Sequence, residues 1–330
     1  MKVLFIGGTG VISSACSELA LERGIDLYLL NRGQSLRPVP EGAQVLQGNI
    51  RDRDSALAAL GEHTFDVVVN WIAFTPEHIE RDLELFRGRT AQYVFISSAS
   101  AYQTPLASLP VTESTPLANP FWQYSRDKIA CEDLLLRAYR NEAFPMTIVR
   151  PSHTYDQTML PLDGRYTVVD RMRRGERIIV HGDGSSLWVL THHRDFAKGF
   201  VGLLGNPHAL GEAFHLTSDE LLTWNQIFEI IARAAGTTAE IVHVPSERIA
   251  RYDARWGDGL LGDKAHSVIF DNSKVKRVVP DFVATIPFVQ GAAEIMAWHD
   301  ADASRRTVDP ERNSLIDAII AAQENVQPGS

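Results

Sequence analysis

Short continuous runs of apolar residues alternate with longer amphipathic segments over the first 150 residues. The run Val3-Leu4-Phe5-Ile6 comes directly before a glycine-rich turn, and FDVVVN at 65–70 is a second such run. Uninterrupted apolar runs are typical of parallel strands that are buried on both faces, and their alternation with helices predicts a doubly wound α/β sheet. We expect strands at 3–6, 27–30, 43–46, 65–70, 93–97 and 146–150, and helices at 11–23 and 53–60.

The pattern becomes irregular after Arg150-Pro151 and mixes short strands with helices. No internal repeat or low-complexity linker separates the two halves, so we expect one compact unit with a cleft between them. The segments expected to be helical are 168–174, 192–204, 222–235 and 310–323, and the expected strands are 178–180 and 241–244.

The composition narrows the class of protein. A hydrophobic share of 45% is enough for a real core, and a net charge of −9 disfavours binding to nucleic acid or to an anionic membrane. The two cysteines, Cys16 and Cys131, fall in expected helices without metal-ligand spacing, so we expect buried thiols in a reducing compartment. No apolar stretch approaches the ~20 residues that span a membrane, and the first apolar run is too short for a signal peptide. We therefore expect a cytoplasmic protein.

The turn after the first strand has the chemistry of a phosphate-binding loop. Gly7 and Gly10 allow a tight turn and close approach of a pyrophosphate, and the start of the next helix offers free N–H groups. The place of the third glycine holds Ser13, which affects helix–strand packing and leaves the phosphate site open. A plain glycine-rich turn is the competing interpretation. We expect residues 1–154 to form a dinucleotide-binding Rossmann domain, joined again by parts of 187–216, and 155–330 to form mainly a smaller α+β substrate-binding lobe.

Three further side chains suggest acid–base chemistry. Tyr124 and Lys128 are four residues apart and share a helix face, where an ammonium group lowers the pKa of a phenol. A tyrosine with a lowered pKa can exchange protons with an alcohol. Ser98 ends an expected central strand, at the sheet edge where ligands bind. The competing interpretations are a surface Tyr-Lys pair and a serine that caps a turn.

The order and spacing of these residues resemble the short-chain dehydrogenase/reductase superfamily. The length and the second half are similar to its extended branch, the NAD-dependent epimerase/dehydratase family, which includes nucleotide-sugar epimerases. LLNRG at 29–33 and the segment 205–227 are closer to an atypical subgroup related to chloroplast stem-loop-binding proteins. The stretches that carry the resemblance are GGTG at 7–10, GNIRD at 48–52, NWIAF at 70–74, RP at 150–151, IIVHGDGSS at 178–186 and HHRDFAKGF at 192–200, together with Ser98, Tyr124 and Lys128.

The resemblance implies a role for each of these residues. Tyr124 would be the acid or base, Lys128 would hold the ribose and lower the tyrosine pKa, and Ser98 would orient the substrate oxygen. Hydride would pass between a substrate carbon and a nicotinamide. The implied cofactor-binding residues are Gly7, Thr9, Gly10, Val11, Ile12, Asn31, Arg32, Asn49, Ile50, Ile72, Ala73, Phe74, Ser97, Tyr124, Lys128 and Pro151.

Some positions depart from the family pattern. Asn31-Arg32 stands where an NAD-preferring enzyme carries an acid for the ribose 2′-OH, and a guanidinium suits a 2′-phosphate, so we predict NADP with NAD as the alternative. Arg32 can also stack on adenine or be a solvated turn residue. The segment after Ser98 lacks the Asp-Glu pair of dehydratases, which indicates redox or epimerisation without elimination.

A second departure concerns the substrate. Trp188 and Val189 replace an arginine–aspartate pair that nucleotide-sugar enzymes usually carry after GDGS, so the substrate need not be a nucleotide sugar. A core role for Trp188 and a packing role for His153 are the competing interpretations. Adjacent histidines at 192 and 193 point in different directions on a helix and do not indicate a metal site. The candidate substrate contacts are Ser100, His153, Tyr155 and Trp188.

We therefore expect an NAD(P)-dependent oxidoreductase or epimerase. Its substrate would be a secondary alcohol or ketone of a sugar, nucleotide sugar or sugar-like molecule. A simple NADPH-dependent ketoreductase on a non-sugar metabolite is one alternative, and a dinucleotide-sensing or RNA-binding regulatory relative is another. The resemblance also implies a homodimer through helices at 76–87 and 120–139, where Phe86, Leu134 and Leu135 are apolar.

Overall fold

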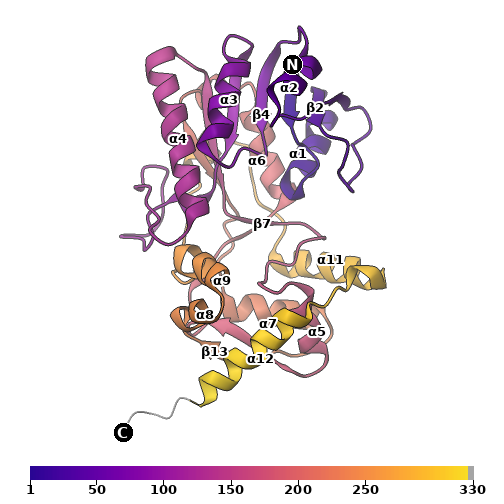
Figure 1. Cartoon of the computed structure of the whole chain (residues 1–330), viewed down its shortest axis with the longest axis vertical. Helices are drawn as coiled ribbons and strands as arrows, with labels where there is room; N and C mark the ends of the chain where they lie inside the picture. The colour runs from indigo at the N-terminus through magenta and orange to yellow at the C-terminus, as the bar shows by residue number, and fades with distance from the viewer. Residues whose placement is uncertain (326–330) are drawn as a thin grey trace.

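A seven-stranded, wholly parallel sheet forms the upper part of the molecule (Figure 1). The computed structural model describes residues 1–325. The strand order is β11-β6-β5-β4-β1-β2-β3, and the reversal next to β1 is the doubly wound topology that the sequence predicts. The strands are β1 (Lys2–Ile6), β2 (Asp26–Asn31), β3 (Gln44–Gln47), β4 (Phe65–Asn70), β5 (Thr90–Ile96), β6 (Met146–Pro151) and β11 (Ala213–Leu216).

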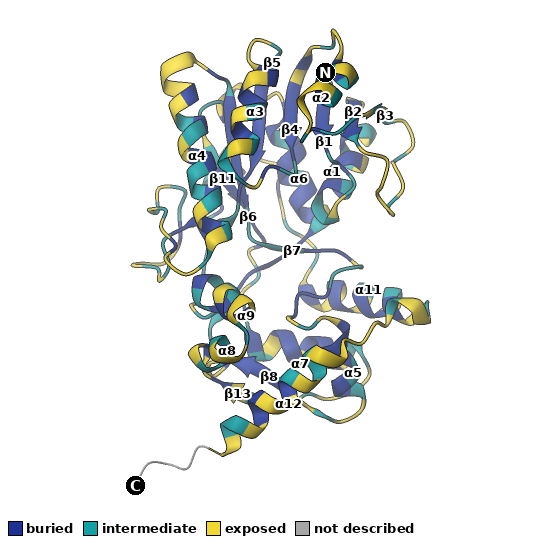
Figure 2. Ribbon diagram, viewed as in Figure 1, coloured by how far each residue is buried: buried dark blue, intermediate teal, exposed yellow. Residues whose placement is uncertain are grey.

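Alternate residues of β1 enter two different cores. Val3 and Phe5 pack with α1 (Val11–Glu22) and α6 (His193–Leu203), whereas Leu4 and Ile6 pack on the opposite face. That opposite face is covered by α2 (Arg53–Leu60), α3 (Pro76–Phe86) and α4 (Gln123–Glu142). Cys16 and Cys131 are fully buried free thiols, one in each core, as expected. Figure 2 shows the buried strands between these two helix layers.

A second lobe with its own hydrophobic core lies below the sheet (Figure 1). Its β8 (Arg177–His181) and β13 (Glu240–Val244) pair in parallel. β7 (His153–Tyr155) pairs with β10 (Leu190–His192), and β9 (Leu187–Trp188) pairs with β12 (Leu222–Thr223). The helices of the second half are α5 (Tyr166–Arg173), α7 (Trp224–Ala234), α8 (Ser246–Tyr252), α9 (Ala254–Gly259), α10 (Ser273–Val278), α11 (Phe288–Asp300) and α12 (Pro310–Glu324), with short helices η1 (Ala99–Ala101), η2 (Pro207–Ala209), η3 (Leu260–Lys264) and η4 (Ala303–Arg305).

Several elements of the second half differ from the sequence-based expectation. α7 begins at Trp224, because Leu222 and Thr223 pair with β9 and the Thr223 hydroxyl caps the helix by accepting from Gln226 N. α8, α9 and α10 were not predicted, since helices of six or seven residues are too short to show periodicity. α10 also returns to the sheet unit, where Val275 joins the α1 and α6 core. None of the described helices is long and apolar enough to cross a membrane.

Candidate active site

Two neighbouring cavities lie where the sheet strands end and face the lobe. The first, of about 430 Å³, joins Val11 of the glycine turn to Ser98 and Tyr124. The second, of about 860 Å³, extends from Tyr124 into the lobe. Each volume is in the range of a small-molecule site. The residues that line both cavities are Trp122, Tyr124, His153, Met159 and Lys264.

The glycine turn is closely packed against the sheet. Gly7 and Gly8 have φ angles of +100° and +96°, which side-chain-bearing residues rarely adopt. A Cβ on Gly8 would come within 2.7 Å of Leu29. Ser13 is buried, and its Oγ accepts a 2.7 Å hydrogen bond from Gly10 N. The serine in the third glycine position therefore stabilises the start of α1.

A chain of three hydroxyl groups holds Ser98 in the first cavity. Ser98 Oγ lies 2.9 Å from Ser100 Oγ, which accepts a 2.8 Å hydrogen bond from Ser125 Oγ. Tyr124 precedes Ser125 on α4. Burial raises the pKa of the Tyr124 phenol, while the Ser98 hydroxyl lowers it and the charge of Asp263 raises it. Ser98 is therefore the group that favours the phenolate in this cavity.

Lys128 links the loop after β4 to the carboxyl end of β5. Its Nζ donates to the carbonyl oxygens of Ala73 and Ile96, at 2.7 Å each, and lies 5.7 Å from the centroid of the Tyr124 ring. Burial lowers the pKa of Lys128 to about 8. Burial raises the pKa of the Tyr124 phenol, so the lowered tyrosine pKa that the sequence predicts is corrected. The effect of Lys128 on the phenol stays a prediction.

The loop after β4 is fixed by a buried carboxylate. Asn70 Oδ1 accepts from Ile72 N at 2.9 Å, and Asn70 Nδ2 donates to Asp82 Oδ2 at 2.5 Å. Tyr93 donates its hydroxyl to the same oxygen at 2.5 Å. Burial raises the pKa of Asp82 to about 6, and these two hydrogen bonds oppose that rise. The network positions the backbone of Ile72 and Ala73 at the sheet edge.

The expected adenosine side lies at the ends of β2 and β3. Asn31 Oδ1 accepts from Gly33 N at 3.0 Å, which shapes the turn, and Arg32 is exposed. Asn49 Oδ1 accepts from Arg51 N at 3.0 Å. Ile50 is buried in the sheet core. This edge therefore offers backbone groups and an exposed guanidinium to a ligand.

Residues 3–216 match the model of the NAD dependent epimerase/dehydratase family. The chain belongs to this family. The family predicted from the sequence is thus confirmed.

Two proteins with similar sequences carry quite different names. The chain is 28% identical over 263 residues to the chloroplast stem-loop binding protein of 41 kDa b from Arabidopsis thaliana, covering 73% of this chain and 65% of that protein. It is 28% identical over 169 residues to a UDP-glucose 4-epimerase of Lactobacillus helveticus, covering 46% of this chain and 51% of that protein. The chain therefore matches between half and two thirds of the length of these relatives.

Solved structures of epimerases share the fold of this family member. Epimerase Mth375 from Methanothermobacter thermautotrophicus has a TM-score of 0.74 at 18% identity, covering 92% of this chain and 94% of that one. The UDP-glucose 4-epimerase from Bifidobacterium longum, in complex with NAD+ and UDP, has a TM-score of 0.72 at 19% identity, covering 92% and 100%. At these identities the likeness shows the fold, which confirms the predicted Rossmann class.

Two residues that the sequence predicts as ligand contacts lie outside both cavities. The hydroxyl of Ser97 donates to Glu132 Oε1 at 2.5 Å inside the core, so Ser97 does not face the cavity. Tyr155 lines neither cavity, because its ring is fully buried edge-on against Phe288 and His192. The Ser97 hydroxyl and the Tyr155 ring therefore pack in the interior and do not line either cavity.

The other candidate substrate contacts lie at the first cavity. Trp188 Nε1 donates to His153 Nδ1 at 3.1 Å, and burial lowers the pKa of His153 to about 3, so the imidazole is neutral. Trp188 is nevertheless almost wholly buried and packs on Trp224 in the lobe core. Ser100 also lines this cavity, and its Oγ lies 2.9 Å from Ser98 Oγ. Pro151 lines the first cavity.

The apolar side chains expected at a dimer surface already pack against other residues of the same chain. Phe86 and Leu135 are buried in the α3 and α4 core, and Leu134 is half-buried beside it. Their side chains therefore do not offer the exposed apolar face that the sequence suggested. The homodimer itself stays a prediction.

Several lining residues were missed because they come from distant, aperiodic segments. Trp122 precedes α4, Met159 follows β7, and Asp263 and Lys264 belong to η3. Ser125 was missed because a helical serine next to a tyrosine has no distinctive signal. Nothing in the local pattern at 259–268 indicates a contact with residues more than a hundred positions earlier.

Proposed function

We propose that this protein is an NAD(P)-dependent oxidoreductase or epimerase that acts on a secondary alcohol or ketone of a sugar, nucleotide sugar or sugar-like molecule. One observation carries the proposal: Val11 of the glycine turn, Ser98 and Tyr124 line one cavity of about 430 Å³. The cavity thus joins an expected dinucleotide site to an acid–base pair. Membership of the family supports the coarser part of this proposal.

The residues present fit a nicotinamide dinucleotide. The positive φ angles of Gly7 and Gly8 keep side chains out of the turn, and the first N–H groups of α1 have no acceptor within the helix. The loop held by Asn70 and the ammonium of Lys128 would face the ribose and nicotinamide. When bound, the dinucleotide supplies the hydride donor or acceptor.

Each side chain of the proposed triad has a separate task. The Tyr124 phenol gives a proton to the substrate oxygen during reduction and takes it back during oxidation. Ser98 donates a hydrogen bond to that oxygen and thereby positions the reacting carbon. Lys128 keeps positive charge near the phenol as its proton leaves. Trp122, Met159 and Phe270 give the cavity part of its apolar wall.

NADP is our proposed cofactor, with NAD as the alternative. The exposed Arg32 follows Asn31 at the end of β2, so this edge has a guanidinium and no carboxylate at the position expected to face the ribose 2′ group. A 2′-phosphate would gain a charge-assisted contact there.

The relatives include names from both expected substrate classes. Eugenol synthases and a phenylcoumaran benzylic ether reductase keep the non-sugar ketone as the second candidate. The sugar class is our first candidate for the following reason. Two relatives are named UDP-glucose 4-epimerase, and the Bifidobacterium longum structure holds NAD+ and UDP. Another relative is named a stem-loop binding protein, but the net charge of −9 weighs against RNA binding here.

Replacement of Tyr124 by Phe tests the proposal, and Tyr139→Phe on the exposed side of the same helix is the matched control. A panel of nucleotide sugars, sugar phosphates and simple ketones is assayed with both cofactors. We expect Y124F to lower turnover at least about 100-fold with cofactor binding nearly unchanged, and Y139F to behave as wild type. Equal turnover by Y124F and wild type would overturn the proposal.

A further inference from the structure

The loop between β2 and β3 extends from the sheet unit to the segment that follows β7. It covers residues 32–43, which we call the strap, and Figure 1 shows it reaching from the end of β2 toward the lobe. The strap begins at Arg32, the residue expected to face the cofactor ribose. Between Arg32 and Val39, every residue except Arg37 is exposed to solvent. Arg37 is therefore the point at which this half of the strap packs against the rest of the protein.

Arg37 makes two short contacts with the segment after β7. Its Nη1 donates to Asp156 Oδ2 and its Nη2 donates to Thr158 Oγ1, at 2.5 Å each. The side chain of Asp156 is only 1% exposed, whereas that of Arg37 is 28% exposed. Within residues 1–325, the other side-chain hydrogen bonds of the strap stay inside it or go to Asn31. One guanidinium therefore carries the side-chain hydrogen bonds between the strap and the segment after β7.

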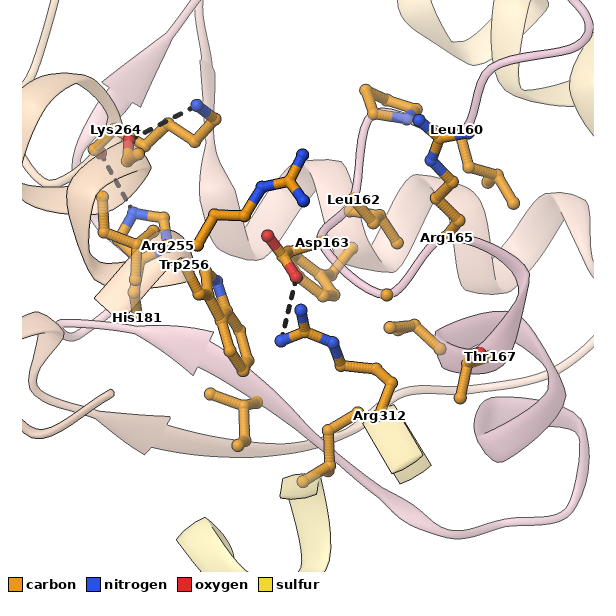
Figure 3. Close-up of a pocket in the computed structure, with 18 of the residues that line it drawn as sticks. Leu160, Leu162, Asp163, Arg165, Thr167, His181, Arg255, Trp256, Lys264 and Arg312 are labelled. Atoms are coloured by element: carbon orange, nitrogen blue, oxygen red, sulfur yellow. Dashed lines mark hydrogen bonds and ion pairs between the residues drawn. The ribbon is translucent and has the colours of Figure 1, made fainter. Parts of the chain in front are cut away.

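This attachment point lies on the wall of the candidate active site. Thr154, two residues before Asp156, lines the smaller cavity together with Val11 of the glycine turn. Met159 comes directly after Thr158 and lines both cavities. Figure 3 shows the same segment continuing along the larger cavity with Leu160, Leu162 and Asp163.

The strap therefore connects two sides of the expected dinucleotide groove. It starts where the adenosine ribose is expected, at Arg32, and it is attached beside the cavity that contains Val11. A dinucleotide with its adenosine at the end of β2 and its pyrophosphate at the glycine turn would lie between these two points. A loop that covers a bound ligand obstructs both its entry and its release until the loop opens.

The strap has the features of a loop that can open. Gly33 and Gly42 lie near its two ends with φ angles of +71° and +96°, and glycines readily absorb changes in backbone angles. Opening breaks the contact to Asp156 Oδ2. Asp156 Oδ1 still accepts from Thr158 N and Thr158 Oγ1, at 2.9 and 2.7 Å. The buried carboxylate thus keeps two hydrogen bonds when Arg37 leaves.

We propose that residues 32–43 close over the bound dinucleotide, and that the contact of Arg37 with Asp156 and Thr158 must break before the dinucleotide enters or leaves. This inference rests on the proposed function for the position of the dinucleotide. Arg37 acts through the strap, so it is a positioning residue with no part in the proton or hydride transfer.

Stopped-flow binding of NADPH and NADH to the full chain tests the strap, because it gives the association and dissociation rate constants separately. The variants are Arg37→Gln, Asp156→Asn and the double variant. Leu36→Ala, at a fully exposed position of the same strap, is the matched control. We expect the first three to raise both rate constants at least about tenfold and to a similar extent, since each weakens the same charged contact. L36A should match wild type.

The two rate constants distinguish the strap from a direct contact with the cofactor. Faster dissociation of R37Q with unchanged association would mean that Arg37 binds the dinucleotide itself, and this overturns the strap. Unchanged rate constants in R37Q and D156N, or no binding by wild type, also overturn it. Thr158→Val removes the other acceptor of Arg37 and replaces D156N if that variant does not fold. If both rate constants rise while Y124F retains full turnover, the strap stands and only the proposed function fails.

Discussion

Lys128 Nζ donates a 2.7 Å hydrogen bond to the carbonyl oxygen of Ile96, and this contact fixes the start of α4 at the carboxyl end of β5. Tyr124 lies one turn earlier on the same helix, and Ser98 lies two residues beyond Ile96. One contact therefore sets the position of the phenol relative to the serine. The relationship explains how residues 26 positions apart in the chain share a cavity.

The pH dependence of turnover should move in opposite directions in two variants. The Ser98 hydroxyl lowers the pKa of Tyr124 and the charge of Asp263 raises it. Oxidation of an alcohol requires the phenolate, so the acidic limb of kcat/KM follows this pKa. We expect Ser98→Ala to move that limb to higher pH and Asp263→Asn to move it to lower pH. A limb that stays in place in both variants would show that Tyr124 is not the titrating group.

Loss of Glu132 should destabilise the sheet unit. Glu132 is fully buried and forms a bidentate ion pair with Arg150, whose Nε and Nη2 donate at 2.9 and 2.6 Å. Removing one partner leaves a buried charge uncompensated, so Glu132→Gln should lower the free energy of unfolding by about 3 kcal/mol. Urea unfolding measures this. Glu142→Gln, which breaks the exposed pair with Arg87, is the control and should change it by less than about 1 kcal/mol.

Asp82 should give the protein a pH-dependent stability. Its pKa is about 6 when folded and near 3.8 when unfolded, so the folded state binds the proton more tightly. Stability from this group is complete below pH 3.8 and falls as the pH rises to about 6. Asp82→Asn removes the titration while retaining an acceptor oxygen for Asn70 and Tyr93. The unfolding free energy of D82N relative to wild type should rise by about 2 kcal/mol between pH 4.5 and 7. An unchanged difference would contradict the assigned pKa.

The loop at 32–43 should loosen when its contact with the lobe is removed. Arg37 donates to Asp156 Oδ2 and Thr158 Oγ1 at 2.5 Å each, and Asp156 is buried. Arg37→Gln should therefore accelerate amide hydrogen exchange over 32–43, measured by mass spectrometry. Arg53→Gln, which removes only an exposed pair with Asp54, should leave exchange in this loop unchanged. Equal exchange in R37Q and wild type would show that the contact does not order the loop.

Local chemistry in the sequence predicted much of the sheet unit. The apolar runs located the strands, and α2 and β4 have the expected bounds, because buried parallel strands and short capped helices carry strong signals. The glycine turn and the Tyr124–Lys128 spacing indicated the candidate site for the same reason. These features depend on neighbours within a few residues.

Long-range partners were beyond what the sequence could predict. The sequence predicts that Ser97 contacts the cofactor, but its hydroxyl donates to Glu132, 35 positions later, and spacing alone does not reveal such pairs. Tyr155, predicted as a substrate contact, packs in the lobe core against Phe288, which lies more than a hundred positions later in the chain. The larger cavity is lined by η3 and by Arg165 and Arg255. These residues lie on segments that have no periodic pattern of their own, so the sequence does not predict their position.

The most direct test of the central claim is a calorimetric titration of the purified chain with NADPH and NADH, after any cofactor that co-purifies has been extracted and identified. We expect that a nicotinamide dinucleotide is either extracted or bound at one site per chain, that NADPH binds more tightly than NADH, and that Lys128→Met weakens this binding. If no dinucleotide is extracted and neither one binds, the proposed function is wrong.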